Sequence, residues 1–175
     1  MKLFISGSNS PLGKYLVFHL SKNSEIELTQ GSSKPAVGQV EFNLLKKESV
    51  DNLNNFDYFL HLAYPFKLNH ENLLSELDIL NKILQKNIKI INIASLSGYL
   101  EKSNHYGKYK REVEKWCLEK NQVNLISGLI FGSGYNGQIK KLFNFLKYFP
   151  FKPELNVNGD RKSTRLNSSH ANISY

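Results

Sequence analysis

Residues 2–20 of the chain read KLFISGSNSPLGKYLVFHL, and this stretch decides the fold. It opens with a short apolar run over residues 2–6, the pattern of a buried strand. From Pro11 the apolar residues recur at helical spacing, which predicts a helix over residues 11–22 with Ser10 as its N-cap and Pro11 at its first position. The residues between these elements must form a tight turn. The stretch is therefore a strand, a tight turn and a helix, the opening of a β-α-β unit.

Strands and helices continue to alternate after this opening. Further strands are predicted from short apolar runs over residues 25–30, 39–42, 57–62, 88–94 and 123–127. Further helices are predicted over residues 46–53, 69–86, 104–120 and 137–148. Regular β-α alternation is typical of a parallel sheet covered by helices. The sequence therefore predicts an α/β fold of the Rossmann type, a doubly wound parallel sheet with helices on both faces.

The last sixteen residues differ in composition from the rest of the chain. Arg161 and Arg165 lie there, whereas lysine accounts for all the other basic residues upstream except Arg111. The string from Asp160 onward resembles a translated sequencing adapter. We therefore expect a single domain over residues 1–159 and a non-native tail over residues 160–175.

Composition excludes several classes of function. The net charge is +8 at pH 7, but the lysines are dispersed and form no block of five or six like charges. Nucleic-acid binding, which needs a basic patch with interleaved aromatic residues, is not expected. No apolar run approaches the roughly 18 residues of a membrane span, and Met1 leads directly into a strand pattern, so we expect a cytoplasmic protein without a membrane partner. Cys117 is the only cysteine, and neither it nor the histidines show the ligand spacing of a metal site.

The turn after the first strand has the composition of a phosphate-binding turn. Glycines at Gly7 and Gly13 permit a sharp bend and a close approach of the backbone to a pyrophosphate, which the N-terminus of the following helix would hold. Ser10 stands where such turns carry a middle glycine, so its side chain either points away or hydrogen-bonds a phosphate oxygen. Glycines also mark ordinary turns, but the position of this turn in a β-α-β chain favours a dinucleotide site.

A second chemical signal is the pair Tyr106 and Lys110 on a predicted helix. Residues four apart share a helical face, so the ammonium can lie close to the phenol. A neighbouring cation favours phenolate and lowers the pKa of a tyrosine, as proton exchange near neutral pH requires. The alternative is a solvated amphipathic face, because a Tyr-x-x-x-Lys spacing is common by chance.

Together these features resemble the extended short-chain dehydrogenase/reductase family, which contains nucleotide-sugar epimerases, dehydratases and reductases. The motifs that carry the resemblance are the glycine turn at residues 7–13, Asn43-Leu44, residues 57–63, residues 93–99, the Tyr106 and Lys110 pair, and residues 126–132. The likeness extends from Met1 to about Gly159. It implies that the C-terminal part, which supplies most of the substrate pocket in the family, is missing.

The resemblance implies an NAD(P)-dependent oxidoreductase or epimerase that acts by hydride transfer, with a nucleotide-linked sugar as the expected small-molecule substrate. Tyr106 would be the general acid/base, Lys110 would lower its pKa and hold the nicotinamide ribose, and Ser95 would hydrogen-bond the reacting hydroxyl or carbonyl. Ser97 competes with Ser95, which is preferred because it stands four residues before Tyr99. The residues expected to contact the cofactor are Gly7, Asn9, Ser10, Leu12, Gly13, Ser32, Lys34, Asn43, Leu44, Leu62, Ala63, Tyr106, Lys110, Gly128 and Leu129.

The end of the second predicted strand bears on the choice of cofactor. A carboxylate there would bind the ribose 2′-hydroxyl of NAD, whereas a cation with hydroxyls accommodates the 2′-phosphate of NADP. Residues 28–34 contain Ser32, Ser33 and Lys34 but no acid, so NADP is preferred over NAD unless Lys34 merely belongs to a loop. The alternative function is a non-catalytic NAD(P)-binding sensor or assembly factor of the same fold. Retention of Ser95, Tyr106 and Lys110 argues against it, and a homodimer of the full-length protein is compatible with either function.

Overall fold

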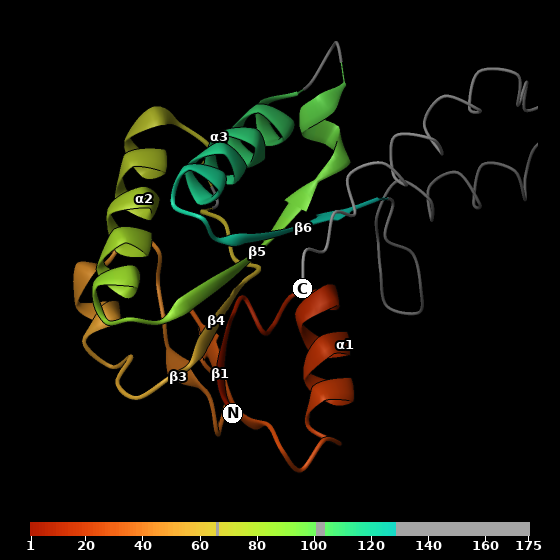
Figure 1. The fold of residues 1–175 in the computed structure, drawn as a ribbon, viewed down its shortest axis with the longest axis vertical. Coiled ribbons are helices and arrows are strands. Elements are labelled where there is room, and N and C mark those ends of the chain that lie inside the picture. Colours follow the sequence, from red (N-terminus) through yellow and green to blue (C-terminus); the bar gives the residue numbers. More distant parts are fainter. Residues whose placement is uncertain (66, 101–103, 129–175) are drawn as a thin grey trace, which may run out of the picture. The chain divides into compact units, whose positions relative to one another are not determined.

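In the part of the chain that the structure describes, six strands form one parallel sheet in the order β3-β2-β1-β4-β5-β6 (Figure 1). The computed structural model describes residues 1–65, 67–100 and 104–128. The strands are β1 (Lys2–Ser6), β2 (Glu27–Ser32), β3 (Val40–Glu41), β4 (Tyr58–His61), β5 (Lys89–Ser95) and β6 (Val123–Ser127). The chain moves outward from β1 to β3, crosses the sheet to β4 and moves outward again to β6. This is the doubly wound order, so the predicted fold class is confirmed.

Helices cover both faces of the sheet (Figure 1). They are α1 (Pro11–Leu20), α2 (His70–Gln85) and α3 (His105–Glu119), with short 3-10 turns η1 (Lys47–Val50) and η2 (Leu96–Tyr99). The helix α1 packs on one face, and α2 and α3 pack on the other. None of the helices in the described residues is long and apolar enough to cross a membrane.

Each of the three helices begins at a side-chain cap. Ser10 Oγ accepts the Gly13 amide at 3.0 Å before α1, as predicted, and Pro11 occupies the first helical position. Asn69 and Asn104 cap α2 and α3 in the same way. A capping side chain satisfies one of the free amides that every helix start exposes, which fixes where the helix begins.

The middle of the chain differs from the prediction. The strand predicted over residues 25–30 runs instead from Glu27 to Ser32, because Asn23 organises a turn over the preceding residues and Ser32 still pairs with β3. The helix predicted over residues 46–53 is only the 3-10 turn η1, since its hydrogen bonds join residues three apart. The turn η2 was not predicted.

The remaining predictions on the C-terminal residues are outside the described part of the chain. They concern the helix over residues 137–148, the boundary between the domain and the tail after Gly159, and the expected contact of Leu129 with the cofactor.

The two faces of the sheet have separate apolar cores. The larger core lies under α2 and α3, where Phe4 and Phe59 stack with ring centroids 5.6 Å apart and Ile90 is fully buried. The smaller core lies under α1 and contains Leu3, Ile5, Leu60 and Leu62. Alternate strand residues point to opposite faces, so each strand contributes to both cores. Because all strands are parallel, their carboxyl ends meet at one edge of the sheet, where the candidate residues gather.

Candidate functional site

The turn after β1 adopts a backbone that only glycine accommodates well. Gly7 has φ of +69°, and a Cβ atom there would lie 2.9 Å from the Ala63 amide nitrogen. Gly13 is buried beneath the turn, where an added Cβ would overlap the Gly7 carbonyl oxygen. The tight turn is therefore confirmed, and it lies against the segment that follows β4.

This turn leaves amide donors without an acceptor among the described residues. The amides of Ser8 and Ser10 donate to backbone carbonyls within the protein. Those of Asn9 and Leu12 have no such partner in the described part of the chain. Both lie at the N-terminus of α1, where the aligned peptide dipoles favour an anion. The geometry fits phosphate oxygens.

The side chain of Asn9 fastens the glycine turn to the loop after β2. Its Nδ2 donates to Ser32 Oγ at 2.8 Å and to the Lys34 carbonyl at 3.0 Å, and its Oδ1 accepts from Gln39 at 2.9 Å. Ser32 Oγ also accepts the Lys34 amide at 3.1 Å. The polar groups of Asn9 and Ser32 thus bond within the protein. The Lys34 residue is exposed, so its ammonium is the group here that can meet a ligand phosphate.

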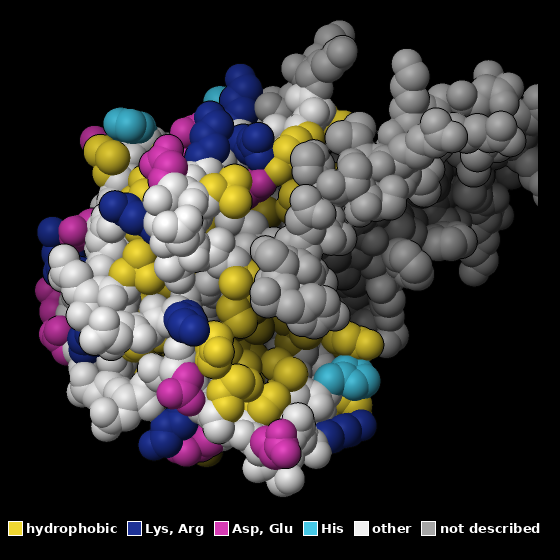
Figure 2. All heavy atoms as spheres, in the orientation of Figure 1, with side chains coloured by type: hydrophobic (Ala, Val, Ile, Leu, Met, Phe, Trp, Pro, Cys, Tyr) yellow, Lys and Arg dark blue, Asp and Glu magenta, His cyan; other side chains and the backbone are white. Residues whose placement is uncertain are grey.

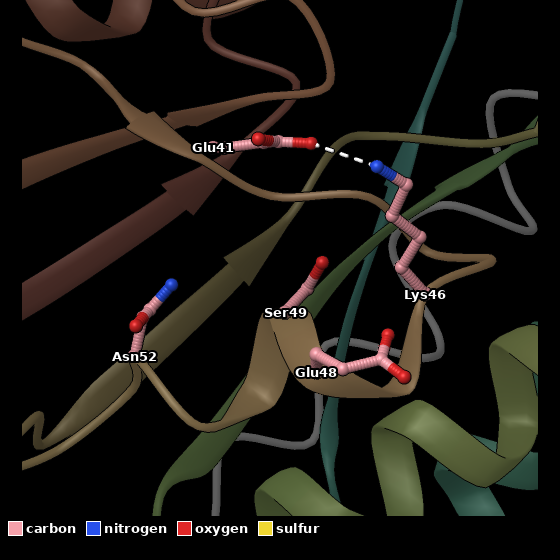
Figure 3. A pocket seen from close by; sticks show the side chains of 5 residues that line it. All are labelled: Glu41, Lys46, Glu48, Ser49 and Asn52. Atoms are coloured by element: carbon pink, nitrogen blue, oxygen red, sulfur yellow. Dashed lines mark hydrogen bonds and ion pairs between the residues drawn. The ribbon is translucent and has the colours of Figure 1, made fainter.

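Asn43 and Leu44 follow β3 and are held by the turn η1. The Asn43 amide donates to Ser49 Oγ at 3.0 Å, while the Leu44 side chain is buried in the larger core. Beside them lies an open hollow of about 430 Å³ (Figure 3), lined by Glu41, Lys46, Glu48, Ser49 and Asn52. Lys46 and Glu41 form an ion pair across it at 3.0 Å. None of the predicted catalytic residues lines this hollow.

The other expected cofactor contacts lie at the ends of β4 and β6. Leu62 is buried in the smaller core, and its amide donates to Ser6 Oγ at 3.2 Å. Ala63 is half-buried against Gly7. Gly128 is exposed directly after β6.

Tyr106 and Lys110 share one face of α3 and meet the same neighbour. The rings of Tyr106 and Tyr64 pack edge to face with centroids 5.2 Å apart. The Lys110 Nζ atom lies 5.8 Å from the centroid of the Tyr64 ring. Both residues thus contact the segment after β4, and they share one face of α3 as their spacing predicts.

Lys110 is a buried cation, with only 3% of its surface exposed. Burial lowers its pKa, while the Glu76 carboxylate acts in the opposite direction. No described residue accepts a hydrogen bond from its ammonium. Lys110 Nζ is not among the fully enclosed unpaired polar atoms of the described residues, so the ammonium remains accessible to a ligand with hydroxyl groups.

A close backbone contact holds the serine candidates beside α3. Ser95 ends β5, and its hydroxyl lies 2.9 Å from the hydroxyl of Ser97. Gly107 directly follows Tyr106, and an added Cβ there would overlap the Ser97 carbonyl oxygen. The segment of Ser95 and Ser97 thus packs on the helical turn that carries Tyr106. The structure leaves both serines available for the predicted role.

Tyr99, whose position favoured Ser95 over Ser97 as the candidate serine, links η2 to α3. Its hydroxyl donates to Glu114 Oε1, and Arg111 donates to the same oxygen at 2.8 Å. The Arg111 guanidinium lies 4.0 Å from the centroid of the Tyr99 ring. Burial and the Glu114 carboxylate raise the pKa of Tyr99, so it acts here as a neutral hydrogen-bond donor.

Sequence reasoning missed a buried polar network that joins α2, α3 and β4. Glu76 on α2 is fully buried, bonded to His61 at 2.8 Å and to Tyr109 at 2.7 Å. Its signal in the sequence is a charged residue on the apolar stripe of α2 that contains Ile79 and Ile83.

Comparison with solved structures shows what the fold is similar to. UDP-N-acetylglucosamine 4-epimerase from Bacillus cereus is 18% identical with a TM-score of 0.62, over 83% of this chain and 66% of that chain. UDP-glucuronic acid 4-epimerase from Bacillus cereus, in complex with NAD, is 19% identical with a TM-score of 0.56, over 72% of this chain and 55% of that chain. A short-chain dehydrogenase/reductase from Brucella ovis is 10% identical with a TM-score of 0.57, over 86% and 93%.

The chain has the fold of these enzymes. It matches between about half and two thirds of the length of the two epimerases. No protein-family profile matches the chain, and no curated protein matches it in sequence. At these identities the comparisons establish the fold alone.

Proposed function

We propose that the chain is the cofactor-binding part of an NAD(P)-dependent oxidoreductase or epimerase of the extended short-chain dehydrogenase/reductase type, acting on a nucleotide-linked sugar. The observation that carries the proposal is the buried residue Lys110, whose ammonium is given no acceptor among the described residues, one helical turn from Tyr106. Similar folds in two sugar-nucleotide epimerases, one holding NAD, support it. A cytoplasmic location and a homodimer of the full-length protein belong to the same proposal.

The described residues fit a dinucleotide at two points. The free amides of Asn9 and Leu12 would hold the pyrophosphate, and Lys110 would hold the hydroxyls of the nicotinamide ribose. When bound, the nicotinamide supplies the hydride chemistry, and the protein supplies orientation.

Three side chains would act on the substrate. Tyr106 Oη would exchange a proton with the reacting hydroxyl, and the Lys110 cation would stabilise the phenolate that forms. Ser95 Oγ would orient the same hydroxyl, with Ser97 as its hydrogen-bond partner. All three lie near the carboxyl ends of β4 and β5.

Cofactor binding tests the glycine turn directly. The fluorescence of NADH and NADPH should report binding to the chain, and Ser10→Asp should weaken it about tenfold or more because a carboxylate would face the phosphates. Aspartate caps helices as well as serine does, so the stability of α1 should be preserved. Unchanged affinity in Ser10→Asp would show that the pyrophosphate lies elsewhere.

Two lysine variants test the protein's contacts with the two ends of the cofactor separately. Lys110→Met should weaken NADH and NADPH alike, because both carry the nicotinamide ribose. Lys34→Ala should weaken only NADPH, because only NADPH carries the 2′-phosphate. Tighter binding of NADH than NADPH by the wild-type chain would overturn the proposed preference for NADP.

Catalysis is tested on the full-length protein with UDP-N-acetylglucosamine and UDP-glucuronate, the substrate types of the similar epimerases. Tyr106→Phe should remove turnover and retain cofactor binding, whereas Lys108→Ala, an exposed neighbour on α3, should retain both. Cofactor binding without turnover of nucleotide sugars would favour the non-catalytic alternative.

A further inference from the structure

Tyr64 lies next to both the glycine turn and the helix α3. It is the third residue after β4 and directly follows Ala63. The Ala63 amide donates to Ser6 Oγ at 3.3 Å, and a Cβ atom added to Gly7 would lie 2.9 Å from the Ala63 nitrogen. On its other side Tyr64 precedes the buried Pro65, and a proline restricts the backbone of the residue before it. The backbone of Tyr64 is therefore held on both sides.

The ring of Tyr64 contacts both residues of the candidate pair on α3. Its centroid lies 5.2 Å from the centroid of the Tyr106 ring, and the two planes meet at 68°, an edge-to-face contact that aromatic rings favour. The Lys110 Nζ atom lies 5.8 Å from the same Tyr64 centroid, within the range over which a ring attracts a cation. One side chain from the segment after β4 thus restricts the positions of both the phenol and the ammonium.

The contact of Tyr64 with Lys110 differs from the other lysine-aromatic contacts among the described residues. Lys22 lies over the Phe18 ring and Lys89 over the Tyr58 ring, and both of these lysines are exposed. Lys110 is 3% exposed. The attraction between a cation and a ring is stronger where water is excluded, so the ring of Tyr64 has the larger effect on the position of its lysine.

Tyr64 itself is not a core residue. It is 51% exposed, whereas Tyr106 is half-buried. An aromatic ring stabilises a fold chiefly through the apolar area that it buries. Fold stability therefore gives little reason for an aromatic ring at this position, whereas contact with two residues of the candidate site gives one.

We propose that Tyr64 is a positioning residue of the candidate site, whose ring holds the Tyr106 phenol and the Lys110 ammonium in the arrangement that proton exchange needs. Without this ring, Tyr106 gains freedom to adopt rotamers that turn its phenol away from Lys110. Misplacement of a reacting group by about 1 Å can cost roughly a hundredfold in rate. The inference rests on the proposed function, which gives the two residues on α3 their roles.

Steady-state kinetics of the full-length protein with the two nucleotide sugars named above test this role. Tyr64→Leu should lower kcat about ten- to hundredfold and weaken NADH binding much less. Tyr64→Phe should restore most of the lost kcat, because the ring and not the hydroxyl makes both contacts. Tyr15→Leu is the matched control and should behave as the wild type, since Tyr15 is 60% exposed on α1 and packs on His19 instead.

Three kinetic outcomes would overturn the proposal. The first is a wild-type kcat in Tyr64→Leu, and the second is a loss in Tyr64→Phe as large as in Tyr64→Leu. The third is a raised KM or weaker cofactor binding with unchanged kcat, which would mean that the ring binds a ligand and does not position Tyr106.

A second measurement needs neither cofactor nor turnover. In NMR spectra of the chain labelled with ¹³C-tyrosine, the ring current of Tyr64 should displace the ring signals of Tyr106, which Tyr106→Phe assigns. Tyr64→Leu should move these signals towards their positions in the unfolded chain, whereas Tyr64→Phe and Tyr15→Leu should leave them in place. Unmoved Tyr106 signals in Tyr64→Leu would refute the contact and the proposal with it.

The two measurements distinguish failure of this inference from failure of the proposed function. A full-length protein that binds neither NADH nor NADPH refutes the proposed function and the role of Tyr64 with it. A protein that binds the cofactor and turns over a nucleotide sugar equally well with leucine at position 64 refutes only the inference.

Discussion

At the scale of single residues, Gly7 and Gly38 both have a positive φ, but their surroundings differ. Gly7 has φ of +69° and Gly38 has φ of +82°. An added Cβ at Gly7 would press on the Ala63 amide, whereas nothing lies within 4 Å of the same atom at Gly38. Comparing alanine variants at the two positions therefore separates the cost of backbone strain from the cost of steric overlap.

We predict that Gly38→Ala costs about 1–2 kcal/mol of unfolding free energy, the strain of a left-handed alanine. Gly7→Ala should cost about 1–3 kcal/mol more, because the neighbouring backbone must also move. Urea unfolding of the two variants measures both values. Equal losses would mean that the turn after β1 can relax, contrary to its close contact with Ala63.

The buried thiol of Cys117 gives the protein a pH dependence at alkaline pH. Burial and the Glu76 carboxylate raise the pKa of this thiol to about 12. The unfolded chain loses the thiol proton near its ordinary pKa of 9.0, whereas the folded protein keeps it. The folded state then binds more protons, so this contribution to stability is complete below pH 9 and is lost as pH rises towards 12.

We predict that the stability advantage of wild type over Cys117→Ala shrinks by up to about 2 kcal/mol between pH 9 and 10.5. The cavity left by alanine gives a constant offset and Tyr109 titrates in both proteins, so the difference reports the thiol together with its coupling to Lys110. Urea unfolding at several pH values provides the measurement. A difference independent of pH would contradict the raised pKa.

At the scale of elements, the contact of α3 with η2 sets the position of the serine candidates. Ser97 and Gly107 touch through their backbones, and the Tyr99 bond to Glu114 closes the same interface. The position of Ser95 relative to Tyr106 thus depends on a glycine that carries no chemistry itself.

We predict that Gly107→Ala destabilises the protein by about 1–3 kcal/mol, the usual cost of inserting atoms into a packed contact. In a helix without this contact, the same change would stabilise by up to about 1 kcal/mol, so the sign of the effect is diagnostic. Thermal or urea unfolding measures it, with Lys108→Ala as the exposed control. Stabilisation by Gly107→Ala would refute the close packing of α3 on η2.

At the scale of the whole described region, the two faces of the sheet are unequally covered. Two helices cover one face, whereas α1 alone covers the other, and Figure 2 shows hydrophobic side chains beside α1. On the edge strand β6, Val123 and Leu125 are each 52% exposed. They align with Ile91 and Ile93 of β5, which are only half-buried on the same face.

This asymmetry predicts the order of hydrogen exchange. Amides of β1 and β4, paired on both sides in the middle of the sheet, should exchange last. Amides of β6 should exchange earlier, because this strand pairs with β5 alone among the described strands and has an exposed face. Mass spectrometry of peptides after deuterium labelling tests the order. Equal protection of β6 and β1 would contradict it.

The sequence alone determined the features that depend on neighbours along the chain. The strand, turn and helix of residues 2–20, the Ser10 cap and the common face of Tyr106 and Lys110 follow from local sterics, local hydrogen bonds and helical spacing. The alternation of strands and helices also predicted the doubly wound sheet. Shorter elements were less predictable: the helix expected over residues 46–53 is one 3-10 turn, because few residues there contribute to either core.

Only the tertiary structure decided the surroundings of these residues. Asn9 bonds Ser32 and Lys34 across more than twenty positions, and Glu76 on α2 accepts the hydroxyl of Tyr109 on α3. Such contacts depend on which strands become neighbours and how helices rotate on the sheet, and no local pattern encodes either. The chemical character of a side chain can thus be read from the sequence, but its burial, its partners and its charge state are set by elements that folding brings from far along the chain.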